Sequence, residues 1–108
     1  MATTDLTGGV KMDPTLPNDG DSVAISYSGK LAQNSNDITL NVGYGKPNKF
    51  FDTQKVTMQK KGNEYQAHFK VKFSDRMNMY FEDSQGSKDD NNGSFYQAQA
   101  VADYESYG

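Results

Sequence analysis

The sequence predicts an all-β domain, and three observations lead to that prediction. Apolar and polar residues alternate along several stretches, most clearly over residues 64–73. Turn-forming residues recur about every 8 to 15 positions, and no stretch has the spacing of an amphipathic helix. We therefore expect an antiparallel, immunoglobulin-like β-sandwich of six to eight strands.

The strand over residues 64–73 should anchor the core. Its apolar residues occupy every second position, and Gln, His and Lys side chains fill the gaps. Since successive side chains of a strand point to opposite faces, one face is apolar and the other is in contact with water. On a helix the same residues would scatter around the axis. The apolar face consists of Tyr65, Ala67, Phe69, Val71 and Phe73.

The same alternation predicts the other strands in order along the chain. The Gly- and Pro-containing residues 1–20 should be extended, with a short edge strand near 7–12. Further strands are expected at about 22–28, 37–43 and 54–60, around residues 77–81, and over 95–102, where the composition would also allow a helix.

Loops are expected between these strands. Residues 43–48 should form a loop that carries an aromatic residue, residues 61–63 a hairpin turn, and residues 83–94 a long polar loop. The domain organisation that follows is an extended segment at 1–20, one sandwich at 21–103 and a short tail at 104–108.

Composition and charge exclude several classes of function. The 108 residues suffice for one domain, and the absence of cysteine rules out disulfides. A net charge of −3 argues against nucleic acid or an anionic membrane as the main partner. No apolar run approaches the ~20 residues of a membrane span, and the first residues do not have the pattern of a signal peptide.

The sequence offers no catalytic constellation. Its one histidine, His68, falls on the polar face of the anchor strand, where a surface role is expected. No Ser/His/Asp set and no Cys or His cluster can be assembled. We therefore expect a protein that is not an enzyme, with no catalytic residues and no zinc site.

The polar loop 83–94 leaves two interpretations open. Its Asp and Asn oxygens could hold calcium, which takes about six to eight oxygen ligands, but their spacing does not match an EF-hand. Alternatively, Asp90 and Asn91 cap the backbone of their own turn, as these residue types often do.

Several pieces in order resemble the starch-binding carbohydrate-binding modules of families 25 and 53. They are the strand 39–45 that ends in Gly43-Tyr44-Gly45, the pair Phe50-Phe51, the strand containing Val56-Thr57-Met58, and the segment from Tyr80-Phe81 to the acidic loop that ends near Phe95. The resemblance covers roughly residues 20–97. It implies a β-sandwich that presents aromatic rings to α-glucan chains.

The resemblance also implies where a sugar would bind. Asn41 stands at the family's His position, Phe50 (or Phe51, one residue on) at its first Trp, and Lys88 at its second Trp. One of two stacking platforms is therefore missing, and Tyr44, Tyr80 or Tyr96 is either a substitute platform or a core residue. The ligand-binding residues implied are Asn41, Tyr44, Phe50, Phe51, Lys88, Asp90 and Asn91.

Three possibilities remain open at this point, and one of them is that the chain is an unrelated β-sandwich, with or without bound calcium. The other two assign a function within the resembled fold. In the first, the chain is a non-catalytic module for α-glucan, weakened by the lost tryptophans, monomeric, and part of a larger secreted protein outside the cell. In the second, the same fold has lost sugar binding and acts as a structural or protein-interaction domain.

Overall fold

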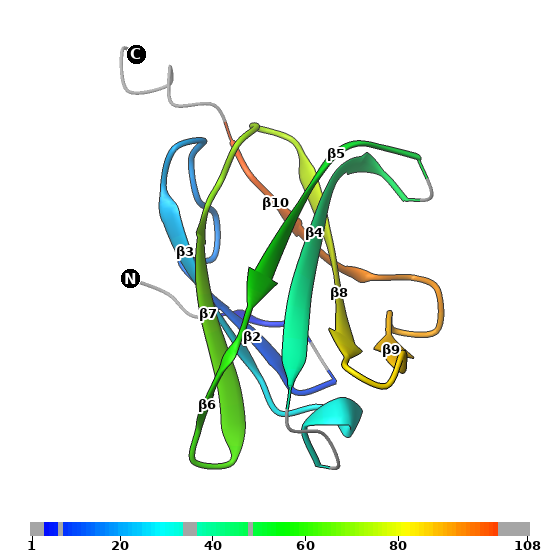
Figure 1. Ribbon diagram of the computed structural model, residues 1–108. Coiled ribbons are helices and arrows are strands. Elements are labelled where there is room, and N and C mark those ends of the chain that lie inside the picture. The colour runs from blue at the N-terminus through cyan, green and yellow to red at the C-terminus, as the bar shows by residue number, and fades with distance from the viewer. Residues whose placement is uncertain (1–3, 7, 34–36, 48, 102–108) are drawn as a thin grey trace.

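Two antiparallel sheets pack face to face in the computed structural model, which describes residues 4–6, 8–33, 37–47 and 49–101 (Figure 1). One sheet has the strand order β1-β2-β3-β7-β6, and the other has the order β10-β8-β4-β5 with β9 paired to β8. The all-β sandwich predicted from the sequence is thereby confirmed. The described residues contain one short 3₁₀ helix, η1 (Lys30–Gln33), and no α-helix.

The strands of the first sheet include the anchor. They are β1 (Thr4–Asp5), β2 (Val10–Asp13), β3 (Ser22–Tyr27), β6 (Gln59–Lys61) and β7 (Glu64–Lys70). The strands of the second sheet are β4 (Ile38–Lys46), β5 (Lys49–Thr57), β8 (Arg76–Asp83), β9 (Lys88–Asp89) and β10 (Tyr96–Gln99). These exceed the six to eight strands expected, because β1, β6 and β9 have only two or three residues each.

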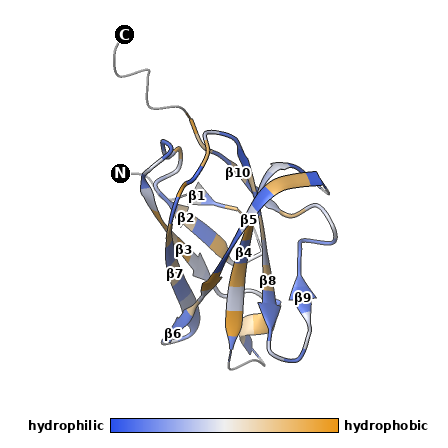
Figure 2. Ribbon diagram, turned by 45° about the horizontal axis from the view of Figure 1, so that its top comes forward, coloured by the Kyte–Doolittle hydropathy of each residue, from blue (hydrophilic) through white to orange (hydrophobic). Residues whose placement is uncertain are grey.

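The alternation that predicted the anchor strand also describes its burial. Tyr65, Ala67, Phe69 and Val71 are buried, His68 is exposed as expected, and Phe73 is partly exposed beyond the end of β7. Hydrophobic residues recur along β4, whereas β6 and β9 are hydrophilic (Figure 2). The core therefore lies between the two sheets, on the inner face of each.

Five strands differ from the sequence prediction in their position or their bounds. β2 lies between β1 and β3 instead of at an edge, and it contributes the fully buried Val10 and Met12. β4 continues to Lys46 through the expected loop, and β5 begins at Lys49, several residues early. β9 forms inside the expected loop 83–94, and β10 covers only part of 95–102. The predicted tail 104–108 lies outside the described residues.

A β-bulge lies near the start of β5. The register between β4 and β5 shifts between Tyr44 and Gly45, where Phe50 pairs with Gly45 and Asp52 pairs with Tyr44. The extra residue, Phe51, has no partner on β4. Bulges bend a strand and re-aim its side chains, so the two adjacent phenylalanines serve different surfaces.

Candidate functional site

The surface that carries most of the predicted site is the solvent-facing side of sheet β10-β8-β4-β5, here called the outer face. Along β8, Met77, Met79 and Phe81 are buried in the core, so the alternate residues point outward. Two of those residues, Tyr80 and Glu82, are half-buried side chains available at the surface. The outer face is therefore where a ligand could meet aromatic and charged groups together.

Three half-buried rings gather on the outer face, and we call them the aromatic cluster: Phe50, Tyr80 and Phe95. The rings of Phe50 and Phe95 meet edge to face with centroids 5.4 Å apart, and those of Tyr80 and Phe95 lie 5.8 Å apart. They come from β5, from β8 and from the turn before β10. Edge-to-face contacts hold rings stiffly, which suits a preformed site.

Glycine at position 43 makes room for the Phe50 ring. A Cβ atom placed on Gly43 would come within 2.4 Å of Phe50, closer than real side chains approach. The ring therefore lies against the bare backbone of β4. Any larger residue at this position would displace the ring from the cluster.

The Phe95 ring is positioned by a strained backbone. Phe95 has φ of 62°, a left-handed conformation that is unusual for a bulky residue. Its N–H donates to the carbonyl oxygen of Asp90 at 2.8 Å, and its own carbonyl oxygen accepts from the Asn91 side chain at 3.2 Å. Strain held in place by such bonds is found most often at functional sites.

Charged side chains border the aromatic cluster. The Lys88 Nζ atom lies 5.2 Å from the centre of the Tyr80 ring and 4.0 Å from a Glu82 carboxylate oxygen. Asp90 accepts a hydrogen bond from the Gly93 N–H at 3.0 Å and lines a cavity together with Lys88. This cavity is shallow, measures about 560 Å³, and is lined by Lys49, Phe50, Thr53, Tyr80, Lys88, Asp90 and Phe95.

Asn41 belongs to the same face but lies beneath it. Its side chain is only 2% exposed, and its Nδ2 atom donates to Glu82 at 3.1 Å. Its Oδ1 atom is buried without a hydrogen-bond partner in the described part of the chain. Asn41 thus supports Glu82, which Lys55 and Lys88 also approach, and almost none of its side chain is open to the surface.

Tyr44 does not present its ring to the surface. It is fully buried between the sheets, and its hydroxyl donates to Gln54 and accepts from the Lys72 N–H. Burial raises the pKa of this hydroxyl above its ordinary value. Tyr44 continues the buried alternation of Ile38, Leu40 and Val42, a signal that places it in the core.

Phe51 lies on a second hollow at the end of the sandwich. Its side chain is 56% exposed, and its ring packs edge to face against Phe73 with centroids 4.9 Å apart. The structure therefore brings Phe50, Lys88 and Asp90 together around one cavity. It places Phe51 at a neighbouring one, and Asn91 within the turn that holds Phe95, where its side chain donates to the Phe95 carbonyl oxygen.

The acidic loop uses its carboxylates internally. Asp83 accepts from the N–H groups of Gln85 and Ser87, and Asp90 caps Gly93, as the capping interpretation predicts. Asp89 is buried and accepts from the hydroxyls of Tyr27 at 2.6 Å and Tyr96 at 2.9 Å. No group of three or more acidic or histidine side chains that could hold a metal occurs among the residues described. Calcium binding at this loop stays an untested prediction.

The sequence prediction left out Phe95 and Glu82, and also Lys49 and Thr53, which line the cavity. The adjacent pair Phe95-Tyr96 carried a signal, because one of two neighbouring strand residues must face away from the core. Tyr96 is the buried member, hydrogen-bonded to Asp89. Tyr80, one of the three tyrosines considered as substitute platforms, is the one whose ring lies on the outer face.

The comparisons with known proteins found no relative of this chain. No family model matches the chain, and neither a curated protein nor a solved structure matches it. Within the described residues, no helix has the length and apolar character needed to cross a membrane. The assignment of function therefore depends on the geometry of the outer face.

Proposed function

We propose that the outer face binds α-glucan chains without catalysis, as an accessory carbohydrate-binding module does. The observation that carries the proposal is the aromatic cluster of Phe50, Tyr80 and Phe95, bordered by Lys88 and Asp90 around one shallow cavity. The apolar C–H face of a sugar ring packs against an aromatic ring. The charged side chains beside it can donate to and accept from the sugar hydroxyls.

The site differs from the tryptophan-based platforms of the family that the chain resembles. Phe50 offers a smaller ring than Trp, and Lys88 covers Tyr80 where a second Trp would stand. Loss of one stacking ring costs about 1–3 kcal/mol, by analogy with bases that stack on aromatic side chains. We therefore expect an affinity roughly 5- to 150-fold below that of a two-tryptophan site.

The decisive experiment is calorimetric titration of the chain with maltoheptaose, with a cellulose oligosaccharide as the control ligand. Phe50→Ala should reduce the affinity for maltoheptaose about 5- to 150-fold, because it removes one ring of the cluster. Leu16→Ala is the control, since it removes an exposed apolar side chain that lines neither of the two hollows to which Phe50 contributes. Circular dichroism of both variants reports whether the sandwich is retained.

The alternative is a domain of the same fold that binds a protein partner instead of sugar. One observation favours it: Phe51 and Phe73 form an exposed ring pair outside the aromatic cluster. Absence of maltoheptaose binding by the unmodified chain, together with no retention on insoluble starch, would reject the glucan proposal and leave this alternative.

A further inference from the structure

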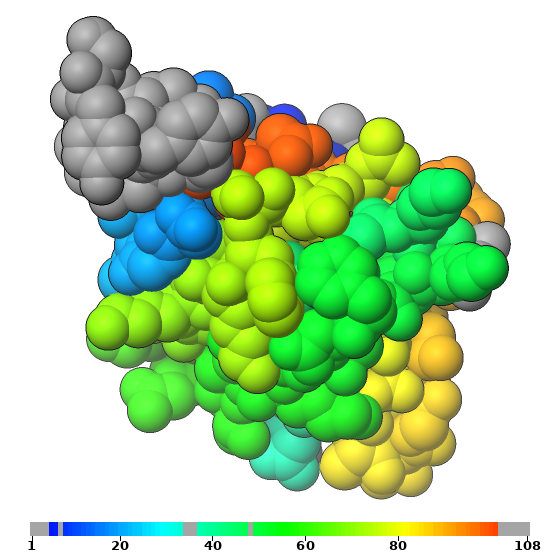
Figure 3. All heavy atoms as spheres, turned by 90° about the horizontal axis from the view of Figure 1, so that it is seen from above, coloured from blue at the N-terminus to red at the C-terminus, as the bar shows by residue number. Residues whose placement is uncertain are grey.

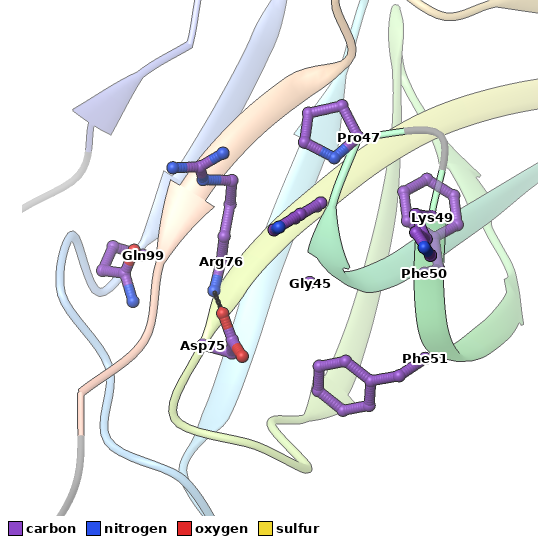
Figure 4. Close-up of a pocket in the computed structure, with 9 residues that line it drawn as sticks. Gly45, Pro47, Lys49, Phe50, Phe51, Asp75, Arg76 and Gln99 are labelled. Atoms are coloured by element: carbon purple, nitrogen blue, oxygen red, sulfur yellow. Dashed lines mark hydrogen bonds between the residues drawn. The ribbon is translucent and has the colours of Figure 1, made fainter.

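A second hollow lies next to the aromatic cluster and differs from it in charge. It measures about 990 Å³ and runs between Phe50 and Phe51 of β5 on one side and Arg76 and Gln99 on the other, past Gly45 (Figure 4). We call it the end groove, because it opens at the end of the sandwich where residues 70–76 lie beside the start of β5 (Figure 3).

Positive charge predominates in the end groove. Lys46, Lys49 and Arg76 line it, and none of the three has an ion-pair partner within the part of the chain that is described. By contrast, Lys55, Lys72 and Lys88 each lie within 4.0 Å of a carboxylate oxygen. The groove therefore holds its cations uncompensated, in a chain whose net charge is −3.

One carboxylate, Asp75, also lines the end groove. Its Oδ1 atom accepts a hydrogen bond from the backbone N–H of Arg76 at 2.7 Å (Figure 4). The charged side chains of the lining thus number three positive and one negative, which leaves a balance of +2. A guanidinium can form two parallel hydrogen bonds with a carboxylate, so Arg76 is the best-suited partner for an anion.

The end groove is continuous with the cavity at the aromatic cluster. Lys49 and the Phe50 ring line both hollows. A chain-like ligand that packs on Phe50 therefore passes directly between Lys49 and Arg76 when it continues along the surface. The exposed Phe51 ring offers a further apolar contact inside the groove.

We propose that the end groove is a second glycan subsite that selects sugar residues bearing a carboxylate. The occupant is the continuation of the chain bound at Phe50, so the inference extends the proposed glucan function. Charge complementarity supports this occupant, because an acidic sugar presents to Lys46, Lys49 and Arg76 the counter-charge that Asp75 supplies only in part.

A matched pair of ligands tests this subsite. One is maltoheptaose, and the other is maltoheptaose whose primary alcohols have been oxidised to carboxylates. We expect the acidic oligosaccharide to bind about tenfold more tightly at low salt, since several exposed pairs each contribute a few-fold. In about 1 M salt, where the screening length falls to about 3 Å, the preference should disappear.

Two variants, Arg76→Gln and Lys11→Gln, test whether the preference for the acidic ligand arises in the end groove. Arg76→Gln should lower the affinity for the acidic ligand about threefold more than it lowers the affinity for neutral maltoheptaose. Lys11→Gln removes the same charge from an exposed position on β2, in the other sheet, and should change neither affinity.

The outcomes separate this inference from the proposed function. If both ligands bind equally, or if Lys11→Gln acts like Arg76→Gln, the acidic subsite is rejected while glucan binding stands. If only the acidic ligand binds and Phe50→Ala has no effect, the subsite stands and the glucan proposal fails. Binding to anionic phospholipid vesicles without binding to acidic glucan would show that the exposed Phe51 and its cations face a lipid surface, and would overturn the inference.

Discussion

The segment 88–96 supplies two regions of opposite character. Its inward residues, Asp89 and Tyr96, join Tyr27 in a buried network in which each hydroxyl donates to the carboxylate. Its outward residues include Lys88 and Phe95, which help form the aromatic cluster and its border. A short stretch of chain thus contributes to the core and to the candidate site by alternation.

The difference between the two regions lies in where their polar groups find partners. In the core, the Tyr27 ring stacks on Phe81 at 4.0 Å, and the Tyr27 hydroxyl is fully engaged by Asp89 and the Leu31 N–H. On the outer face, the charged groups of Lys88 and Asp90 line a shallow cavity that a ligand could enter. We infer that the buried network stabilises the turn within segment 88–96. This turn then positions the aromatic rings of the site.

Alkali should have the largest effect on the buried network. Burial and the hydrogen bonds to Asp89 raise the pKa of both Tyr27 and Tyr96 above the ordinary value of 10.0. Because the folded state holds these hydroxyls protonated, their contribution is complete below about pH 10 and is lost as pH rises beyond it. Urea unfolding at a series of pH values from 8 upward measures this. A free energy of unfolding that stays constant above pH 10 would contradict the network.

Asp89→Ala should have the second-largest effect, a loss in the free energy of unfolding. It leaves two buried tyrosine hydroxyls without their acceptor, at a cost of about 3 kcal/mol in the free energy of unfolding. Asp89→Asn retains an acceptor oxygen and should cost less. Denaturant titrations compare the two variants, and equal losses would show that the carboxylate charge is the only contribution.

Gly43→Ala tests whether the outer face depends on its glycine. The added Cβ would meet the Phe50 ring, so the ring must move out of the aromatic cluster. We expect a loss of about 1–2 kcal/mol in stability and a clear fall in maltoheptaose affinity, although Gly43 itself need not touch the sugar. Retained affinity would mean that the position of the Phe50 ring is unimportant.

Lys88→Trp should have the smallest of these effects, and it should raise the affinity for maltoheptaose. The position is exposed beside the Tyr80 ring, so an indole there would extend the stacking surface. Addition of one ring should tighten maltoheptaose binding about fivefold or more. Calorimetry measures the change, and an unchanged affinity would place the sugar away from Tyr80. The related exchange Asn41→His is less suitable, because Asn41 is buried beneath Glu82.

Period-two alternation carried enough information to predict most of the fold. It located β3, β7 and β8, and it assigned the correct faces to His68 and to the aromatic residues of β7. It also applied to Tyr44, whose burial follows from its place after Val42. The sequence prediction nevertheless ended this strand at residue 43, and it therefore placed Tyr44 in a loop and, through the family resemblance, at the site.

The remaining features depend on contacts that are distant in sequence. The bulge opposite Gly45 cannot be read from residue types, yet next to it Phe50 lines both hollows and Phe51 lines only the end groove. The burial of Asn41 depends on Glu82, which lies on another strand. The left-handed Phe95 depends on bonds across its turn. Such contacts appear only when the sheets are assembled.

The most direct test of the outer-face site is to follow backbone amide resonances by NMR while maltoheptaose is added. We expect the largest shifts at Phe50, Thr53, Tyr80, Lys88 and Phe95, around the shared cavity, with little change in β2 and β3 of the other sheet. Shifts confined to β2, β3 or β7, or no shifts at saturating sugar, would contradict the account.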